Sequence, residues 1–209
     1  METPLFDQWR SRSPHYDESH EAVCDTVRRF VAQEITPNVD KWEAAGELPR
    51  ELHKKAAEAG ILGLNYPEEF GGTGPAFTLF HGLVQSEELA RPGAGGIGAS
   101  LMSHGIGLPP VLAMGSEQLK QRIAPAVLAG DKIICLGITE PGGGSDVANL
   151  KTKATRKGGA YVVNGAKTLI TSGMRADYIT LAVRTGGPGI GGVSLLLVET
   201  DRPGVSRTA

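Results

Sequence analysis

The spacing of apolar residues along this chain of 209 residues changes from helical to strand-like near residue 131. Before that point apolar side chains recur every three or four positions, as they do on one face of an α-helix. After it, short apolar runs are separated by glycine-rich turns, which is typical of β-strands. The sequence therefore predicts an α+β fold: an all-α N-terminal domain at residues 1–130, followed by a mostly antiparallel, β-barrel-like domain at residues 131–209.

Apolar spacing in the first part predicts helices at about residues 17–34, 48–59, 77–89, 101–114 and 116–127, the fourth of them interrupted by Gly105, Gly107 and Pro109-Pro110. Gly60 is expected to end the second of these helices, and Pro92 is expected to stop the third. Ser116 is a good N-cap for the last one. Because proline lacks a backbone N–H and collides with the preceding turn, Pro125 is expected to kink or split that helix.

The second part predicts strands at residues 133–139, 152–157, 160–163, 166–171, 178–184 and 193–199. The dipeptide Asn164-Gly165 is the strongest hairpin signal in the chain. We therefore expect a tight turn there, joining residues 161–163 to residues 166–171.

Composition excludes several classes of protein. The formal charge of −2 gives no electrostatic footprint for nucleic acid, and no apolar run approaches the roughly 20 residues that a membrane helix needs. The first residues lack the basic and apolar stretches of a secretory signal, so a cytoplasmic location is expected. Cys24 and Cys135 lie far apart beside apolar neighbours, which favours two reduced, buried thiols.

Several residues that can carry chemistry have structural explanations. Two stretches match G-x-G-x-x-G, at residues 93–98 and 187–192, but the first follows a helix and the second lies between strands, so neither fits a dinucleotide site. The five histidines and two cysteines show no metal-ligand spacing, and no metal site is predicted. Glu87 and Glu88 are interpreted as a solvated helix face in preference to a catalytic carboxylate pair.

The stretch ITEPGGGSDV, residues 138–147, is the strongest candidate for a binding site. Its glycines have no Cβ, so the backbone can lie against a ligand and point N–H groups at it. Thr139 and Ser145 place hydroxyl groups at the two ends of the run. A plain glycine-rich turn, with Asp146 as a cap, is an equally open interpretation. The segment KTLITSG, Lys167–Gly173, adds further hydroxyl groups after the predicted hairpin.

Taken together, these segments resemble the acyl-CoA dehydrogenase family of flavoenzymes, and the resemblance covers essentially the whole chain. Its most specific part is an ordered series of short motifs. The series comprises Ile138–Asp146 (ITEPGGGSD), Thr152–Ala154 (TKA), Asn164–Lys167 (NGAK), Ile170-Thr171 and Ala176-Asp177, with Tyr66–Gly72 (YPEEFGG) in the helical part.

The resemblance implies an FAD site made by two segments. The hydroxyl groups of Thr139 and Thr171 would hydrogen-bond the edge of the flavin ring, where donors stabilise the negative charge that develops during reduction. The glycine loop and Ser145 would face the pyrophosphate of FAD and the acyl-CoA substrate. Position 169, often aromatic in relatives, is leucine here, and Leu136 also lacks an aromatic ring, which reduces the stacking surface for flavin. The implied cofactor-binding residues are Leu136, Ile138, Thr139, Gly144, Ser145, Leu169, Ile170 and Thr171.

The implied reaction is the α,β-dehydrogenation of an acyl-CoA thioester to a 2-enoyl-CoA, a step of fatty acid metabolism. An electron-transferring flavoprotein would accept the electrons. The family's catalytic base lies in a C-terminal helical domain that follows the region matched here, so no residue of this chain is expected to be the base. Relatives are usually homo-oligomers, and the resemblance implies the same for the full-length form.

Two other functions remain open at this point. A non-catalytic FAD-binding, CoA-binding or interaction module of the same fold would keep the loop motifs without the domain that carries the base. A relative that uses the fold for monooxygenation with reduced flavin is a third hypothesis, which the strict Thr-Glu-Pro loop disfavours.

Overall fold

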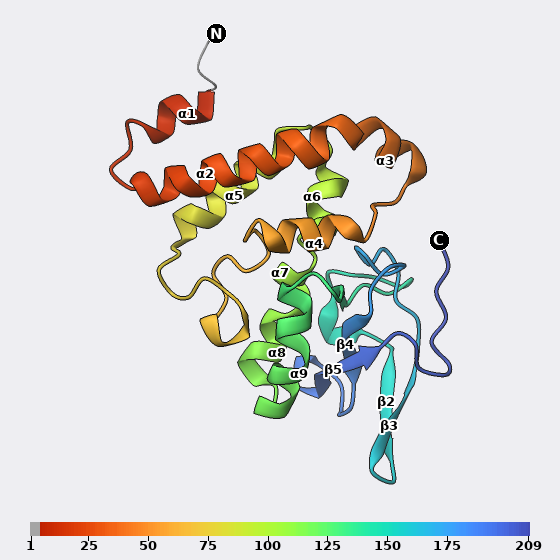
Figure 1. Cartoon of the computed structure of the whole chain (residues 1–209). Helices are drawn as coiled ribbons and strands as arrows, with labels where there is room; N and C mark the ends of the chain where they lie inside the picture. Colours follow the sequence, from red (N-terminus) through yellow and green to blue (C-terminus); the bar gives the residue numbers. More distant parts are fainter. Residues whose placement is uncertain (1–4) are drawn as a thin grey trace. The chain divides into compact units, whose positions relative to one another are not determined.

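The computed structural model describes residues 5–209, apart from the side chains of Leu5 and Phe6 (Figure 1). The chain forms two compact units, each with its own buried core. The first unit comprises the residues up to Met102 together with Leu128–Asp131, and the second comprises Ser103–Val127 together with Lys132–Ala209. The domain boundary expected between residues 130 and 131 stays a prediction.

The first unit consists of helices in the part of the chain that the structure describes. α2 begins where the carboxylate of Asp17 accepts hydrogen bonds from the backbone N–H groups of Ser19 and His20. It continues into a π-helical turn, Val31–Ile35, so the helix expected at residues 17–34 is present as two joined segments. The helices are α1 (Leu5–Arg10), α2 (Glu18–Phe30), α3 (Val39–Ala45), α4 (Glu51–Glu58), α5 (Leu79–Ala90) and α6 (Gly95–Leu101), with 3-10 turns at Thr36–Asn38 and Glu68–Phe70.

The expected helices at residues 48–59 and 77–89 correspond to α4 and α5. α2 and α5 lie side by side, and the fully buried Val27 and Val84 belong to the core of this unit (Figure 1). The short helices α1, α3 and α6 fall outside the expected ranges. Helices of one or two turns are too short to show a full apolar stripe, so periodicity alone misses them.

The second unit contains α7 (His104–Gly107), α8 (Pro109–Met114) and nearly all of α9 (Glu117–Leu128). The hydroxyl of Ser116 accepts a hydrogen bond from the N–H of Leu119 at 3.3 Å, as expected of an N-cap. The expected split of this helix at Pro125 is wrong, because α9 continues past the proline, and the expected kink stays a prediction. Ile123 and Val127 on either side of the proline are buried, and their packing offsets the hydrogen bond that proline cannot make.

The sheet of the second unit is built around β4. β5 runs antiparallel along the whole of β4, while β1 pairs with it in parallel from Ile134↔Tyr178 to Gly137↔Leu181. β2 meets β4 at one pair, Lys153↔Arg184, and forms an antiparallel ladder with β3. The strands are β1 (Ile134–Gly137), β2 (Lys153–Lys157), β3 (Ala160–Asn164), β4 (Tyr178–Arg184) and β5 (Val193–Glu199). The α+β class is confirmed, but the recorded pairings leave the sheet open across the described residues, so its barrel-like closure is not confirmed.

The hairpin predicted at Asn164-Gly165 is wrong. The hairpin turn lies at Gly158–Gly159, between the two strands expected at residues 152–157 and 160–163; Gly158 has a φ of +59°, and residues 166–171 form no strand. Gly165 has another role, because a Cβ placed on it would lie 2.6 Å from Cα of Thr152. The glycine therefore permits a close backbone approach and not a tight turn.

No single helix among the described residues is long and apolar enough to cross a membrane. Gly95–Leu101 and His104–Met114 together, as a bent pair, meet the criterion of length and composition, which buried core helices also meet.

Both cysteine thiols are free and buried, as expected. Burial raises the pKa of Cys24 and of Cys135 to about 12.

Candidate functional site

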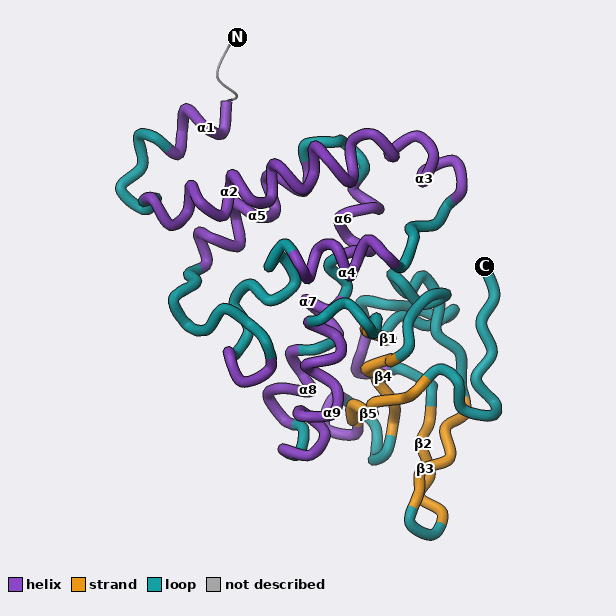
Figure 2. The backbone as a smooth tube through the Cα atoms, viewed as in Figure 1, coloured by secondary structure: helices purple, strands orange, loops and turns teal. Residues whose placement is uncertain are grey.

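Two loops of the second unit carry most of the predicted cofactor-binding residues, and a backbone hydrogen bond joins them. The β1–β2 loop comprises residues 138–152, and the β3–β4 loop comprises residues 165–177 (Figure 2). The N–H of Thr168 donates to the carbonyl oxygen of Thr139 over 2.9 Å. This bond brings together two motifs that lie far apart in the sequence.

Glu140 anchors the β1–β2 loop from inside. One oxygen of its carboxylate accepts the N–H of Lys151 at 2.6 Å, and the other accepts the N–H of Thr152 at 2.8 Å. Burial raises the pKa of Glu140, but hydrogen bonds from Thr152, Lys151 and Lys167 outweigh burial and bring the pKa down to about 2. The carboxylate is therefore ionised at neutral pH, and it ties the two ends of the loop together.

Lys167 connects the β3–β4 loop to the same carboxylate. Its ammonium nitrogen lies 2.9 Å from Oε1 of Glu140 and 2.8 Å from the carbonyl oxygen of Ile138. The side chains of Lys167 and Glu140 are only 9% and 8% exposed. Both loops are thus fixed to one buried ion pair, and removing either partner would leave the other charge without compensation.

The glycines leave the backbone uncovered at the turn of the β1–β2 loop. Glu140 and Gly143 exchange two backbone hydrogen bonds of 3.0 Å, which closes the turn. Gly143 has a φ of +155°, and beyond chain neighbours no atom lies within 4 Å of a Cβ placed on Gly142 or Gly143. Gly144 differs, because a Cβ there would lie 3.1 Å from the side chain of Thr139. The loop therefore offers open backbone beside a threonine hydroxyl.

The β3–β4 loop holds an apolar side chain in solvent. Leu169 and Ser172 have φ values of +56° and +62°, a left-handed conformation that costs a non-glycine residue roughly 1–3 kcal/mol. Leu169 is 89% exposed, while the next residue, Ile170, packs on the buried core of the unit. Left-handed backbone at non-glycine residues clusters at functional sites, so the strain at Leu169 and Ser172 makes this segment a candidate for one.

All eight predicted cofactor-binding residues lie in the second unit. Leu136 is half-buried in β1, and Ser145, Leu169 and Thr171 are exposed; Ile138, Thr139, Gly144 and Ile170 are half-buried. The structure brings the two segments together at Thr139 and Thr168, but no hydrogen bond among the described residues links Ser145 to the β3–β4 loop. The cofactor-binding role of these eight residues stays a prediction.

Sequence reasoning missed Arg184 as an organiser of the site. Its guanidinium group donates to four carbonyl oxygens, those of Ala148 at 2.6 Å, Leu150 at 3.2 Å, Gly187 at 2.6 Å and Gly189 at 3.1 Å. It therefore braces the far end of the β1–β2 loop. Nothing in a single sequence marks such an arginine, because its partners are backbone atoms and could belong to any residue type.

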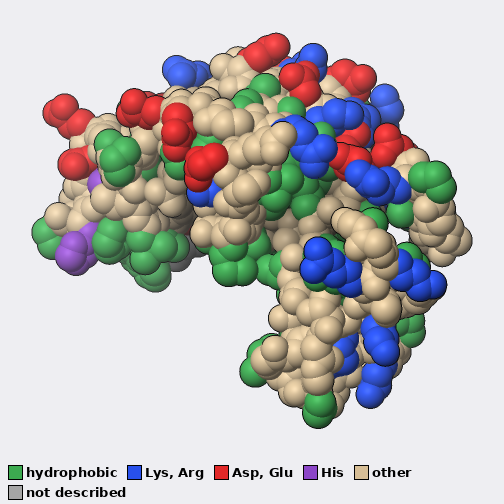
Figure 3. All heavy atoms as spheres, turned by 90° about the horizontal axis from the view of Figure 1, so that it is seen from below, with side chains coloured by type: hydrophobic (Ala, Val, Ile, Leu, Met, Phe, Trp, Pro, Cys, Tyr) green, Lys and Arg blue, Asp and Glu red, His purple; other side chains and the backbone are tan. Residues whose placement is uncertain are grey.

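The charge of the second unit suits an anionic ligand. Its sequence carries twelve basic and six acidic residues, whereas the first unit carries nine basic and seventeen acidic ones. Figure 3 shows lysine and arginine side chains gathered on part of the visible face. Lys151, Lys153, Arg156 and Lys157 are exposed on β2 or just before it. The small net charge of the whole chain therefore conceals a basic unit, which favours the approach of anions.

The interpretation of Glu87 and Glu88 as a solvated face is wrong for Glu88, which is fully buried in the first unit. Its carboxylate accepts hydrogen bonds from Arg28 at 2.8 Å and from Arg91 at 2.9 Å. Burial raises the pKa of Glu88, but the bonds from these two arginines and from Cys24 outweigh it and lower the pKa to about 2. Glu88 is therefore part of an ion cluster that joins α2 to α5.

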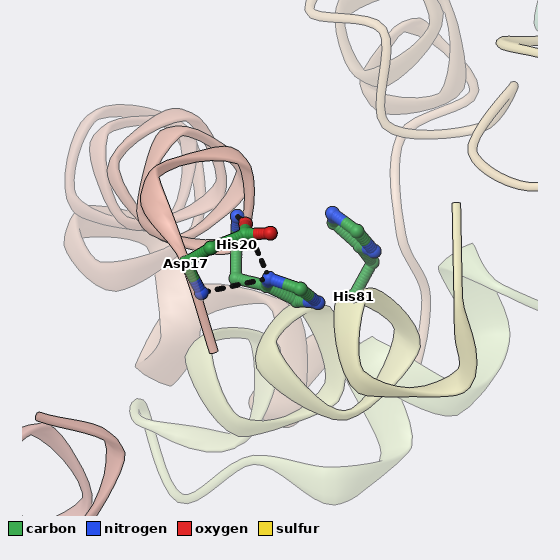
Figure 4. Close-up of side chains that lie close together, drawn as sticks. All are labelled: Asp17, His20 and His81. Carbon is green, nitrogen blue, oxygen red and sulfur yellow. Dashed lines mark hydrogen bonds and ion pairs between the residues drawn. The ribbon is translucent and has the colours of Figure 1, made fainter. Parts of the chain in front are cut away.

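Asp17, His20 and His81 lie side by side in the first unit (Figure 4). Their ligand atoms are within 4.8 Å of one another, a grouping that sequence spacing did not predict. The two imidazole rings stack, with centroids 3.7 Å apart and planes at 18°. Each Nδ1 accepts the N–H of its own N-cap residue, Asp17 at 3.1 Å and Thr78 at 3.0 Å. The Nδ1 lone pair of each histidine is thus used in a hydrogen bond to the backbone. The two nearly parallel rings therefore fit a role as helix caps better than a role as ligands of one shared metal ion.

Comparison with known proteins places the chain in a family. Residues 17–131 match the sequence model described as acyl-CoA dehydrogenase, N-terminal domain, and residues 135–209 match the one described as acyl-CoA dehydrogenase, middle domain. The chain belongs to the acyl-CoA dehydrogenase family, whose members are FAD-dependent oxidoreductases.

Individual relatives are similar over most of this chain but extend beyond it. Acyl-CoA dehydrogenase apdG of Emericella nidulans is 37% identical, over 93% of this chain and 48% of its own length. A solved "probable acyl CoA dehydrogenase" from Mycobacterium abscessus is 51% identical with a TM-score of 0.86, over 90% of this chain and 50% of that one. Glutaryl-CoA dehydrogenase from Mycobacterium smegmatis, solved in complex with FADH2, is 32% identical with a TM-score of 0.83, over 96% and 49%. The chain thus spans about half the length of the curated relatives it matches.

Proposed function

We propose that the second unit forms a flavin-binding half-site of an acyl-CoA dehydrogenase. The observation that carries the proposal is the hydrogen bond between Thr139 and Thr168, which joins the two motif-bearing loops beside uncovered glycine backbone. The open backbone at Gly142 fits a ligand with phosphate oxygens, because an exposed N–H group binds anions, whereas the N–H of Gly143 donates to Glu140 within the turn. The basic character of the unit agrees with the same ligand.

The residues around the two loops have distinct roles in this proposal. Thr139 and Thr171 hold the edge of the flavin ring, and Gly144 and Ser145 contact its phosphates and the acyl-CoA. The backbone of Leu136, Ile138 and Ile170 supports the ring, and the exposed Leu169 covers it from the β3–β4 loop. When bound, FAD supplies the hydride acceptor for dehydrogenation of an acyl-CoA to a 2-enoyl-CoA.

The proposal assigns no residue of the 209 as the catalytic base. Acyl-CoA as substrate, an electron-transferring flavoprotein as electron acceptor, homo-oligomeric assembly, a place in fatty acid metabolism and a cytoplasmic location are parts of the same proposal. The cytoplasmic location rests on the two reduced, buried thiols, and the other parts rest on family membership.

A non-catalytic module that binds FAD or CoA is the second candidate. It is favoured by one observation: the region matched covers about half of each relative, and no residue of this region is assigned as the catalytic base. The two candidates share the flavin site and differ only in turnover.

The first experiment is a titration of the purified chain with FAD, followed by flavin absorbance and fluorescence. We expect bound flavin, and we expect Thr171→Ala to weaken binding about tenfold, as the loss of one hydrogen bond does. A folded Thr171→Ala variant with unchanged FAD affinity would remove Thr171 from the site. A folded wild-type chain that takes up no FAD would contradict the proposed function.

A further inference from the structure

The buried pair of Lys167 and Glu140 is the point where three separate segments of the second unit meet. Glu140 belongs to the start of the β1–β2 loop and binds the backbone N–H groups of Lys151 and Thr152 at its end. Lys167 comes from the β3–β4 loop and binds both Glu140 and the carbonyl oxygen of Ile138. The carboxylate of Glu140 and the ammonium group of Lys167 thus hold these segments by binding backbone atoms and by pairing with each other.

The pair also flanks the hydrogen bond that joins the two loops. Thr139, which accepts that bond, lies between Ile138 and Glu140 in the sequence. Thr168, which donates it, directly follows Lys167. If the side chain of Glu140 moved, the backbone of the adjacent Thr139 would therefore move with it. In the same way, a displacement of Lys167 would move the backbone of Thr168.

We propose that Lys167 and Glu140 form a positioning clasp that sets the spacing between the two segments of the flavin site. The inference rests on the proposed function. Neither side chain is a catalytic residue in this proposal, because both act through the backbone they hold. The clasp fixes the distance between Thr139 and the residues that follow Thr168, so that hydrogen-bond donors of both loops contact the same ligand.

The ammonium group of Lys167 explains why the spacing depends on this pair. Its nitrogen lies between two acceptor oxygens, the carbonyl of Ile138 and the carboxylate of Glu140. Without the cation, the carbonyl oxygen of Ile138 would lose this donor, and Oε1 of Glu140 would keep only the N–H of Thr152, which is costly for a buried charge. The loop would then move to find water, and the spacing to the β3–β4 loop would change.

The clasp can be tested first without any flavin, by hydrogen exchange at individual amides. Lys167→Met and Glu140→Gln should raise the exchange rate of the Thr168 amide about tenfold or more, the effect of losing one charge-assisted hydrogen bond. Lys167→Arg keeps the cation and should restore slow exchange. Lys153→Met is the matched control, because Lys153 is an exposed lysine of the same unit and should leave the rate unchanged. Unchanged exchange in a folded Lys167→Met variant would overturn the clasp.

The second measurement is the affinity for FAD and the visible absorption spectrum of the bound flavin. Lys167→Met should weaken FAD about tenfold and shift the spectrum, whereas Lys167→Arg should recover both. Equal affinity and an unchanged spectrum in Lys167→Met, despite faster exchange, would overturn the positioning role. Absence of FAD binding by the wild-type chain would contradict the proposed function and with it the role toward flavin, while the exchange data would still decide whether the clasp holds the loops. If Lys167→Met fails to fold, Glu140→Gln and Lys167→Arg provide the same comparison.

Discussion

Single residues in the second unit have roles that depend on a distant neighbour. Gly165 shows this most clearly, because the Asn-Gly dipeptide is typical of a hairpin turn, yet the structure uses its glycine for contact with Thr152. Gly142 lies in a run that looks similar in the sequence, and its position is open. The same residue type is therefore constrained at one position and replaceable at another.

Gly165→Ala should lower the free energy of unfolding by at least about 2 kcal/mol, since overpacking and a positive φ act together. A Cβ at this position would lie 2.6 Å from Cα of Thr152, and the φ of Gly165 is +154°. Gly142→Ala is the control and should stay within about 0.5 kcal/mol. Urea unfolding of the three proteins measures the difference, and similar stabilities for the two variants would contradict this account.

At the scale of elements, α2 and α5 are joined at their N-termini by a reciprocal pair of histidines. Each histidine caps its own helix through Nδ1 and reaches the other helix through Nε2. His20 Nε2 lies 3.3 Å from the hydroxyl of Thr78, and His81 Nε2 lies 2.9 Å from the hydroxyl of Ser19. A neutral ring meets both requirements, because Nδ1 must accept and Nε2–H can donate.

We expect the first unit to lose stability as the pH falls below 6.5. Burial lowers the pKa of His81 from 6.5, and the charge of His20 adds to the decrease. The unfolded chain therefore binds the proton more readily, so the stability from this group is complete above pH 6.5 and is lost as the pH falls toward the folded pKa. His81→Gln, which keeps a capping acceptor, should make the thermal unfolding temperature less dependent on pH in this range. An identical pH dependence in the variant and the wild type would exclude His81 as the cause.

At the scale of the whole molecule, each unit contains a buried, ionised carboxylate. Glu88 joins helices of the first unit, and Glu140 joins loops of the second. Both have a pKa lowered from 4.5 to about 2, because hydrogen bonds from cations or backbone N–H groups outweigh burial. The stability of both units should therefore depend on acid pH in the same way, although the two carboxylates have different hydrogen-bond partners.

Acid should therefore destabilise both units over the same range of pH. A carboxyl with a lowered folded pKa contributes stability above its unfolded pKa of 4.5, and this contribution is lost as the pH falls from 4.5 toward 2. Hydrogen exchange between these two pH values should show faster opening of α5 and of the β1–β2 loop. Glu88→Gln should reduce stability at neutral pH and weaken the acid response of the first unit alone. Constant protection from pH 4.5 to 2 would contradict the paired carboxylates.

Local patterns in the sequence determined the α+β class, the helices α2, α4 and α5, the approximate bounds of all five strands, and the motifs of the candidate site. These features follow from periodicity and short motifs, which each segment carries by itself. Only the tertiary structure decided the place of the hairpin turn, the parallel pairing of β1 with β4, the burial of Glu88, and the clasp of Lys167 and Glu140. The physical reason is that strand pairing, burial and ion pairing depend on which distant segments meet, and no local pattern encodes the identity of that partner.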